Sequence, residues 1–353
     1  MPKCSFKNVS IRGIEAVVPH CSRTLDEETE LFGSRKNIEK AKKVTGLWKR
    51  RIADRGTTTL DLCSVASRRL LDAVKCETGS IDGVIFVTQT PDYRIPNNAS
   101  VFHGMEGLSS DCLCFDVNHG CSGYIYGLLN AFSLIQSGMC KKVLLLVGDT
   151  ITKVINPKDK SLAIIHGDAG SATLIEYSCV ENRSNFIIHS DGKKANSICI
   201  KAGGFRNMSN VQTAAEHSDS EGNIRSDDQL YMNGLQVFNF AIQNVPSIVN
   251  EMLDYIGKSI DDIDFFAFHQ ANGIINCGIL EKMAIPIEKA PMRVIGEYGN
   301  TSCATIPLVF SEALGNKVIP HMSVVMTGFG VGLSLASCYI ELNNTTILPV
   351  FEY

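Results

Sequence analysis

Apolar and polar positions follow two periods along the chain, and segments of the two kinds alternate. Alternating or continuous apolar runs are typical of buried strands, and they occupy residues 9–18, 83–88, 112–117, 142–149, 170–177, 263–269, 292–295 and 323–328, the last turning into 333–342. Apolar positions three and four apart are typical of amphipathic helices, and they occupy residues 25–43, 59–74, 99–104, 121–138, 237–256, 273–283 and 302–314. This alternation predicts an α/β fold with a mostly parallel sheet covered on both faces.

The order strand, helix, strand, helix, strand occurs twice, first from Asp82 to Asp149 and again from Asp264 to Gly328. Such a repeat predicts two similar halves, residues 1–178 and 179–353, that meet at a pseudo-twofold axis. A stretch rich in Gly, Asn, Ser and Asp at about 203–228 interrupts the second half. Its composition predicts a surface loop or flap.

Composition narrows the class of protein. A net charge of −4 over 353 residues gives no reason to expect a nucleic-acid partner. Positive charge is local, at residues 40–43 and 49–51, where it forms either solvated faces or a docking patch for an acidic partner. The start lacks the apolar region of a signal peptide, and no run is long enough to span a bilayer. We therefore expect a cytoplasmic protein without a membrane partner.

The 13 cysteines are an odd number, and most stand in apolar, strand-like contexts. This usage favours reduced thiols over a disulfide framework. The chain has no C-x-x-C pair, and the ligand spacing of a zinc site is absent. No structural metal is expected.

Cys121 stands in a corner of small residues between an apolar strand and a helix, flanked by Gly120 and by Ser122 and Gly123. A turn of this kind exposes the sulfur and lets other backbone come close. Unpaired N–H groups at the helix start favour anionic sulfur, which predicts a thiol pKa lowered toward neutrality and a nucleophilic thiolate. The alternative is a small buried cysteine in a turn.

His269 and Asn300 occupy corresponding positions in the second half, one at the end of a strand and one at the start of a helix. Sites in parallel α/β sheets lie beyond the carboxyl ends of the strands, so both side chains could face the same cleft as Cys121. Taken alone, His269 could be a hydrogen-bonded core histidine and Asn300 a turn former.

Five strings together resemble the β-ketoacyl-acyl-carrier-protein synthase III group of the thiolase-like condensing enzymes. They are Gly-Cys-Ser-Gly at 120–123, Ile-His-Gly-Asp-Ala-Gly-Ser-Ala at 165–172, His-Gln-Ala-Asn at 269–272, Gly-Asn-Thr-Ser at 299–302 and Gly-Phe-Gly-Val-Gly-Leu-Ser at 328–334. The resemblance covers nearly the whole chain and implies a thiolase-like fold, in which two duplicated α/β halves form five αβαβα layers. It also implies a homodimer.

By this resemblance, Cys121 takes an acyl group from a thioester, and backbone N–H groups of Cys121 and of the loop at Val331 and Gly332 stabilise the oxyanion. His269 and Asn300 then hold the carbonyl of a malonyl thioester while CO₂ departs and the carbanion attacks the acyl-cysteine. No metal or redox cofactor is needed. Val331 replaces a usual glycine of the family but keeps its N–H.

The resemblance also suggests substrate-binding residues, among which Asn272 and Phe329 belong to the matching strings. Family members that use coenzyme A usually carry Trp and Arg before the Thr-Gly matched here at 45–46, but this chain has Lys40 and Val44 there, and its only tryptophan, Trp48, comes later. That tryptophan is either partly buried in the core or a platform for an aromatic ligand.

Two further positions bear on the substrate. Lys153 stands where a second Arg that clasps adenine is common. With these departures, the resemblance leaves an acyl-carrier protein and coenzyme A both open as the acyl donor. Ile95 stands where the partner subunit offers a side chain to the acyl pocket. Two other functions remain open, namely transfer of the acyl group from Cys121 to an amine or hydroxyl, with His269 as general base, and a non-catalytic subunit of a heteromeric synthase.

Overall fold

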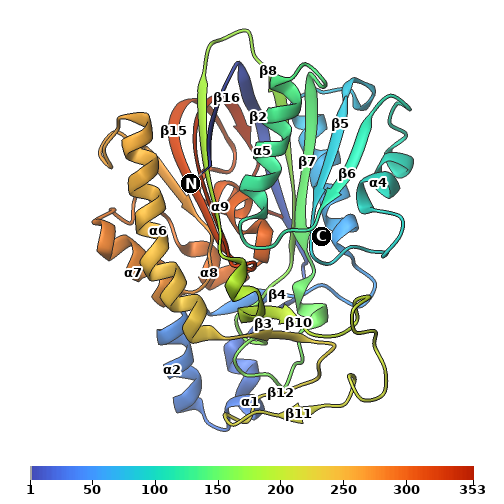
Figure 1. The fold of residues 1–353 in the computed structure, drawn as a ribbon, viewed down its shortest axis with the longest axis vertical. Helices are drawn as coiled ribbons and strands as arrows, with labels where there is room; N and C mark the ends of the chain where they lie inside the picture. Colours follow the sequence, from blue (N-terminus) through green and yellow to red (C-terminus); the bar gives the residue numbers. More distant parts are fainter. Residues whose placement is uncertain (1) are drawn as a thin grey trace.

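The computed structural model describes residues 2–353, and Figure 1 shows a twisted body of strands with helices around and between them. The strands are β1 (Lys3–Lys7), β2 (Val9–Val18), β3 (Ser22–Thr24), β4 (Lys49–Arg51), β5 (Gly83–Val87), β6 (Leu113–Val117), β7 (Lys142–Asp149), β8 (Ala169–Tyr177), β9 (Arg183–Ser190), β10 (Ile198–Ile200), β11 (His217–Ser218), β12 (Ile224–Arg225), β13 (Leu230–Met232), β14 (Phe265–Phe268), β15 (Lys317–Gly330), β16 (Ser334–Ile347) and β17 (Phe351–Glu352). The helices are α1 (Thr29–Phe32), α2 (Arg35–Thr45), α3 (Thr59–Ala73), α4 (Asn98–Glu106), α5 (Gly123–Gln136), α6 (Gly234–Ile256), α7 (Gly273–Met283), α8 (Arg293–Tyr298) and α9 (Thr305–Leu314). Short 3₁₀ helices are η1 (Leu25–Glu28), η2 (Thr78–Ser80), η3 (Ile151–Val154), η4 (Gly192–Ser197) and η5 (Ser302–Ala304).

The main sheet has two parts, each of which contains four strands with the same pairing pattern and one further strand, β6 in the first part and β1 in the second. In the first part the order is β6-β5-β7-β8-β2, and in the second it is β14-β15-β16-β9-β1. The parallel pair β5 and β7 is followed by antiparallel β8 and β2, just as parallel β14 and β15 are followed by antiparallel β16 and β9. The parts join where the end of β16 pairs with β2. The shared pairing follows the repeated order of elements in the sequence only in part, because the second part has no strand that corresponds to β6 and the N-terminal strand β1 lies in the second part.

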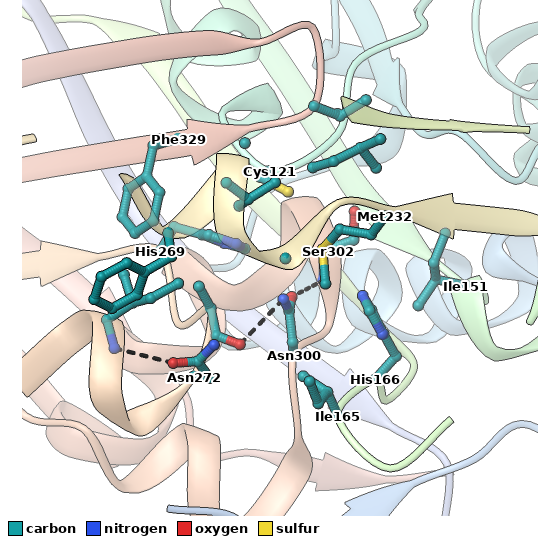
Figure 2. A pocket seen from close by; sticks show the side chains of 18 of the residues that line it. Cys121, Ile151, Ile165, His166, Met232, His269, Asn272, Asn300, Ser302 and Phe329 are labelled. Atoms are coloured by element: carbon teal, nitrogen blue, oxygen red, sulfur yellow. Dashed lines mark hydrogen bonds between the residues drawn. The ribbon is translucent and has the colours of Figure 1, made fainter. Parts of the chain in front are cut away.

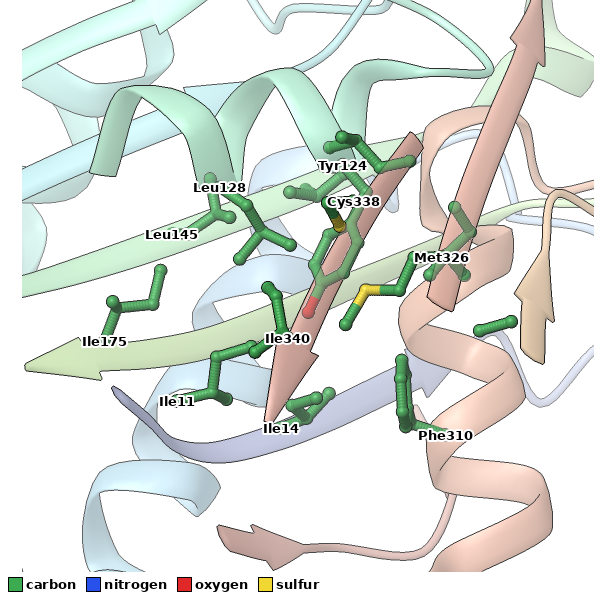
Figure 3. Close-up of a cluster of buried hydrophobic side chains, with 14 of the residues drawn as sticks. Ile11, Ile14, Tyr124, Leu128, Leu145, Ile175, Phe310, Met326, Cys338 and Ile340 are labelled. Carbon is green, nitrogen blue, oxygen red and sulfur yellow. The ribbon is translucent and has the colours of Figure 1, made fainter. Parts of the chain in front are cut away.

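The two parts are separated and covered by helices in five layers. Helices α5 and α9 lie between the parts, where Tyr124 and Phe310 pack against strands of both, as Figure 3 shows. Helix α3 covers the outer face of the first part, and α6 and α7 cover the outer face of the second. Tyr124 is fully buried, and its hydroxyl lies 3.0 Å from Thr173 Oγ1, so its polar end is satisfied.

The structure corrects three predicted features of the fold. The sheet is mixed rather than mostly parallel, because no crossover helix separates β15 from β16 and a short connection can only return antiparallel. Residues 292–295 begin helix α8 instead of a strand, since the buried residues Val294, Ile295 and Tyr298 fall on one helical face. The helix predicted at 25–43 is divided, because its first turn is the 3₁₀ helix η1 and Gly33 at φ +70° ends α1 before α2 begins.

Candidate active site

Cys121 lies between the end of β6 and the start of α5, in a turn that only small residues allow. A Cβ at Gly123 would lie 2.8 Å from Val87 Cγ1, and one at Gly330 would lie 2.5 Å from the Cys121 sulfur. Real Cβ atoms do not approach other atoms this closely, so glycine is required at both positions. The turn therefore packs tightly around the cysteine.

The sulfur faces a cavity of about 450 Å³ that is lined mainly by apolar side chains. Burial raises the pKa of the Cys121 thiol to about 11, although the N–H of Val331 donates to the sulfur and acts in the opposite direction. The predicted lowering of this pKa toward neutrality is wrong. The physical reason is that loss of water in an apolar cavity outweighs the favourable field of the helix start.

His269 follows β14 and lines the same cavity. Its Nδ1 lies 2.7 Å from Thr305 Oγ1, and its ring meets Phe329 edge to face at 5.3 Å between centroids. Burial lowers the pKa of His269 to about 3, so the imidazole is neutral at physiological pH.

Asn300 is held from both sides by backbone. Its N–H donates to Ile165 O at 2.9 Å, and its carbonyl accepts from Gly167 N at 3.0 Å. In the side chain, Oδ1 accepts from Ser302 N at 2.9 Å, and Nδ2 donates to Ala271 O at 3.3 Å. An amide nitrogen carries two hydrogens, so one remains for a ligand. Figure 2 shows Cys121, His269 and Asn300 around one space.

Of the predicted oxyanion donors, the N–H of Val331 already points at the sulfur, and Val331 lines the cavity. The backbone N–H of Cys121 also donates to the sulfur of the same residue. For Gly332 no such contact is recorded among the described residues, so its part stays a prediction.

The predicted substrate-binding residues divide into two groups. Asn272 and Phe329 line the cavity, although Asn272 Oδ1 also caps α7 by accepting from Ile275 N at 3.0 Å. The side chain of Trp48 is 59% exposed and does not line the cavity, so its part in substrate binding stays a prediction. Lys153 donates to backbone carbonyls of the 55–57 turn outside the cavity.

Asp149, at the end of β7, belongs to the site although sequence reasoning did not single it out. Its Oδ1 accepts from the N–H groups of Gln89 and Thr90 at 2.7 and 3.2 Å, and its Oδ2 from the Cys303 thiol at 3.3 Å. This fully buried carboxylate fixes the loop that carries Gln89 to the cavity. A charged residue directly after a wholly apolar strand was the available signal.

Two observations concern sites of other kinds. Within residues 2–353, no group of three or more His, Cys, Asp and Glu side chains is placed to hold a metal ion. In the same residues, no helix combines the length and apolarity needed to cross a membrane.

Comparison with known proteins agrees with the predicted family. Family models described as 3-oxoacyl-[acyl-carrier-protein] synthase III and as its C-terminal part match residues 115–193 and 253–342. The chain is 32% identical to the beta-ketoacyl-[acyl-carrier-protein] synthase III of Caldanaerobacter subterraneus over 84% of this chain and 87% of the relative. It is 31% identical to the Hyphomonas neptunium protein of the same name over 94% of this chain and 98% of that one.

A solved structure is similar along its full length. The 3-oxoacyl-(acyl-carrier protein) synthase of Burkholderia xenovorans LB400 superposes with a TM-score of 0.92 at 36% identity, covering 100% of this chain and 99% of the other. The predicted thiolase-like α/β fold and acyltransferase class are confirmed by these similarities. The chain therefore belongs to the 3-oxoacyl-[acyl-carrier-protein] synthase III family of condensing enzymes.

Proposed function

We propose that this enzyme joins an acyl group held on Cys121 to a malonyl thioester by decarboxylative condensation. The observation that carries the proposal is that Cys121, neutral His269 and Asn300 with a spare N–H line one buried cavity. First, the sulfur attacks the donor thioester carbonyl; a C–S bond forms, and the donor thiol leaves with the proton of Cys121. The Val331 N–H stabilises the oxyanion of this step.

In the second step, the malonyl thioester binds with its carbonyl oxygen at His269 Nε2 and Asn300 Nδ2. The bond to the carboxylate breaks, CO₂ leaves, and the electron pair passes into an enolate that the two donors stabilise. The enolate carbon attacks the acyl carbonyl, and the C–S bond to the cysteine breaks. The sulfur leaves as a thiolate and takes up a proton from water. Nε2 carries the ring proton in the tautomer in which the Thr305 hydroxyl donates to His269 Nδ1, 2.7 Å away, in place of Ser302 O, 3.2 Å away. The steps use only protein groups and thioesters, so we propose that no cofactor takes part.

The relatives' names refer to acyl-carrier proteins, and the surface of α2 supports a carrier as donor here. Lys36, Lys40 and Lys43 are exposed at helical spacing i, i+4, i+7, and none pairs with a carboxylate among the described side chains. The next residue, Val44, lines the cavity together with Ile274. An acidic carrier seated on these lysines would direct its thioester into the cavity.

The exposed edge of β6 supports a homodimer. This strand pairs with β5 on one side only, and the nearby Ile95 is 84% exposed. Arg94 donates to Gly203 O and lies over the ring of Phe205, which is 82% exposed, so the loop at 203–228 adds apolar surface beside Ile95. Exposed large apolar side chains gathered in one region are typical of an interface. We also place the enzyme in the cytoplasm, since all thirteen cysteines are free.

The test is intact mass after incubation with a panel of acyl-coenzyme A and acyl-carrier thioesters, followed by malonyl thioester. We expect a Cys121 adduct that disappears with CO₂ release and formation of a 3-oxoacyl product. C121A abolishes loading, whereas N300A loads but does not decarboxylate. An adduct discharged only by amines or alcohols would show simple acyl transfer, and no adduct with any donor would favour a non-catalytic subunit.

A further inference from the structure

Two polar side chains that line the cavity, those of Gln89 and His166, have no part in the proposed condensation, whereas two others are held by the protein itself. Asn272 caps α7, and Thr45 Oγ1 donates to Ala41 O at 2.8 Å, so both have partners in the protein. The side chains of Gln89 and His166 also line the cavity. The Gln89 amide group and His166 Nε2 make no hydrogen bond to another described residue. Of these two, His166 is the more deeply buried, at 7% exposed.

The imidazole of His166 is oriented by one hydrogen bond. Its Nδ1 lies 3.0 Å from Leu162 O. Because a carbonyl oxygen only accepts, Nδ1 must carry the ring proton, and Nε2 is left as a bare lone pair. Burial lowers the pKa of His166, which agrees with a neutral ring. Nε2 makes no hydrogen bond within residues 2–353, so it can accept one from a ligand that enters the cavity.

The backbone holds His166 firmly in place. His166 forms an isolated parallel bridge with Asn300. A Cβ at the following residue, Gly167, would lie 3.1 Å from Arg51 O, so the chain is packed closely there. Asp168 accepts from Ala53 N at 2.8 Å and from Thr152 N at 3.0 Å. The acceptor is thus preorganised rather than mobile, as a recognition group should be.

The position of His166 relates it to the acyl chain. In Figure 2 it lies beside Asn300 and on the same side of the cavity as Ile151, away from His269 and Phe329. Ile151 and Leu230 belong to a separate apolar cluster that forms this end of the cavity. Cys121, His166, Ile151 and Leu230 line the same cavity, so a group on Cys121 that extends toward Ile151 and Leu230 passes along the wall that His166 forms.

The chemistry of Nε2 restricts its ligand. A bare imidazole nitrogen repels a carboxylate and offers nothing to a carbonyl, so neither the malonyl carboxylate nor a thioester oxygen fits. We propose that His166 Nε2 accepts a hydrogen bond from a hydroxyl on the acyl chain carried by Cys121, so that the donor is a hydroxyacyl thioester. This inference rests on the proposed function and names its substrate class. A plain alkyl chain would leave Nε2 unpaired in an apolar space.

The test compares matched thioesters on one carrier. Loading of Cys121 is followed by intact mass with butyryl thioester and with its derivatives that bear a hydroxyl at each chain carbon in turn. In the native enzyme, we expect one hydroxy derivative to load with a kcat/KM at least about tenfold above that of butyryl, the effect of one buried hydrogen bond. H166F should reduce this preference to about one and raise the rate with butyryl.

H166Q, which keeps a polar terminus near the position of Nε2, should retain part of the preference, and thermal unfolding of both variants checks that they fold. A native enzyme that loads butyryl as well as every hydroxy derivative would overturn the inference. So would equal slowing of all substrates by H166F, because His166 would then contact the amide of the pantetheine arm or serve packing alone. Absence of loading by any thioester would instead overturn the proposed function, and the inference with it.

Discussion

The thiol of Cys121 stays protonated over the ordinary working range of pH, because burial raises its pKa to about 11. Below that pKa, the thiolate fraction grows tenfold for each pH unit, and the thiolate is the reacting form. We therefore expect alkylation of Cys121 by iodoacetamide to accelerate about tenfold per unit between about pH 6 and about pH 9 without a plateau. Peptide mass spectrometry, with C121A as control, distinguishes alkylation of Cys121 from alkylation of the twelve other cysteines. A plateau near neutral pH would mean that the site favours the thiolate.

Gly330 sets how closely the oxyanion loop approaches the nucleophile. A Cβ there would lie 2.5 Å from Cys121 Sγ and 2.7 Å from Cys121 Cβ, and its φ of +152° is unfavourable for other residues. We expect G330A to lower the rate of acyl loading about 100-fold or more, since displacement near 1 Å at a reacting centre has this effect. The matched control is G104A in α4, where a Cβ meets nothing within 4 Å; it should load normally and unfold at slightly higher temperature. Normal loading by G330A would show that the loop can shift without consequence.

At the scale of elements, prediction succeeds where local pattern and boundary residues agree. Helix α7 has the predicted bounds, Gly273–Met283, because Asn272 caps it and a left-handed Ala284 ends it. It fails for the short run at 292–295, where apolar character alone does not distinguish a strand from a buried helix.

Some residues of the candidate site can likewise be identified from local sequence, whereas the roles of others depend on the folded structure. Cys121, His269 and Asn300 could be chosen from the sequence because each follows a strand end or precedes a helix, and the fold brings such ends together. The roles of Asp149 and His166 depend on burial and on hydrogen bonds to distant residues. The pKa of Cys121 likewise depends on the depth of the cavity. None of these properties is local to the sequence.

Helix α2 provides a prediction about the carrier. Reversing the three exposed lysines in K36E/K40E/K43E should raise KM for an acyl-carrier thioester about tenfold, because complementary charge mainly aids encounter. Loading from a short acyl thioester without a carrier should not change. The control K75E/K141E/K317E makes the same change of net charge at exposed lysines elsewhere and should leave both rates unaltered. If the two triple variants behave alike, the carrier docks on another surface.

For the whole molecule, the two halves place the cavity inside one chain but leave the edge of β6 and the apolar surface around Ile95 open. If two copies join through this surface, the enzyme should sediment at twice the mass of one chain. I95D should then shift it toward monomer as the protein is diluted, because a carboxylate buried at an interface is costly. The control V180D puts the same charge on another exposed apolar residue, 68% exposed and remote in the chain, and should remain dimeric.

Acyl loading by the monomeric I95D distinguishes two roles of the dimer. If Ile95 completes the acyl cavity of the partner, loading of longer chains should change in selectivity as well as in rate, whereas an interface that only stabilises the fold should lower all rates alike. A native enzyme that sediments as a monomer would contradict the homodimer. The exposed surface around Ile95 and Phe205 would then have to bind a different protein, since an apolar area of this kind is unfavourable in water.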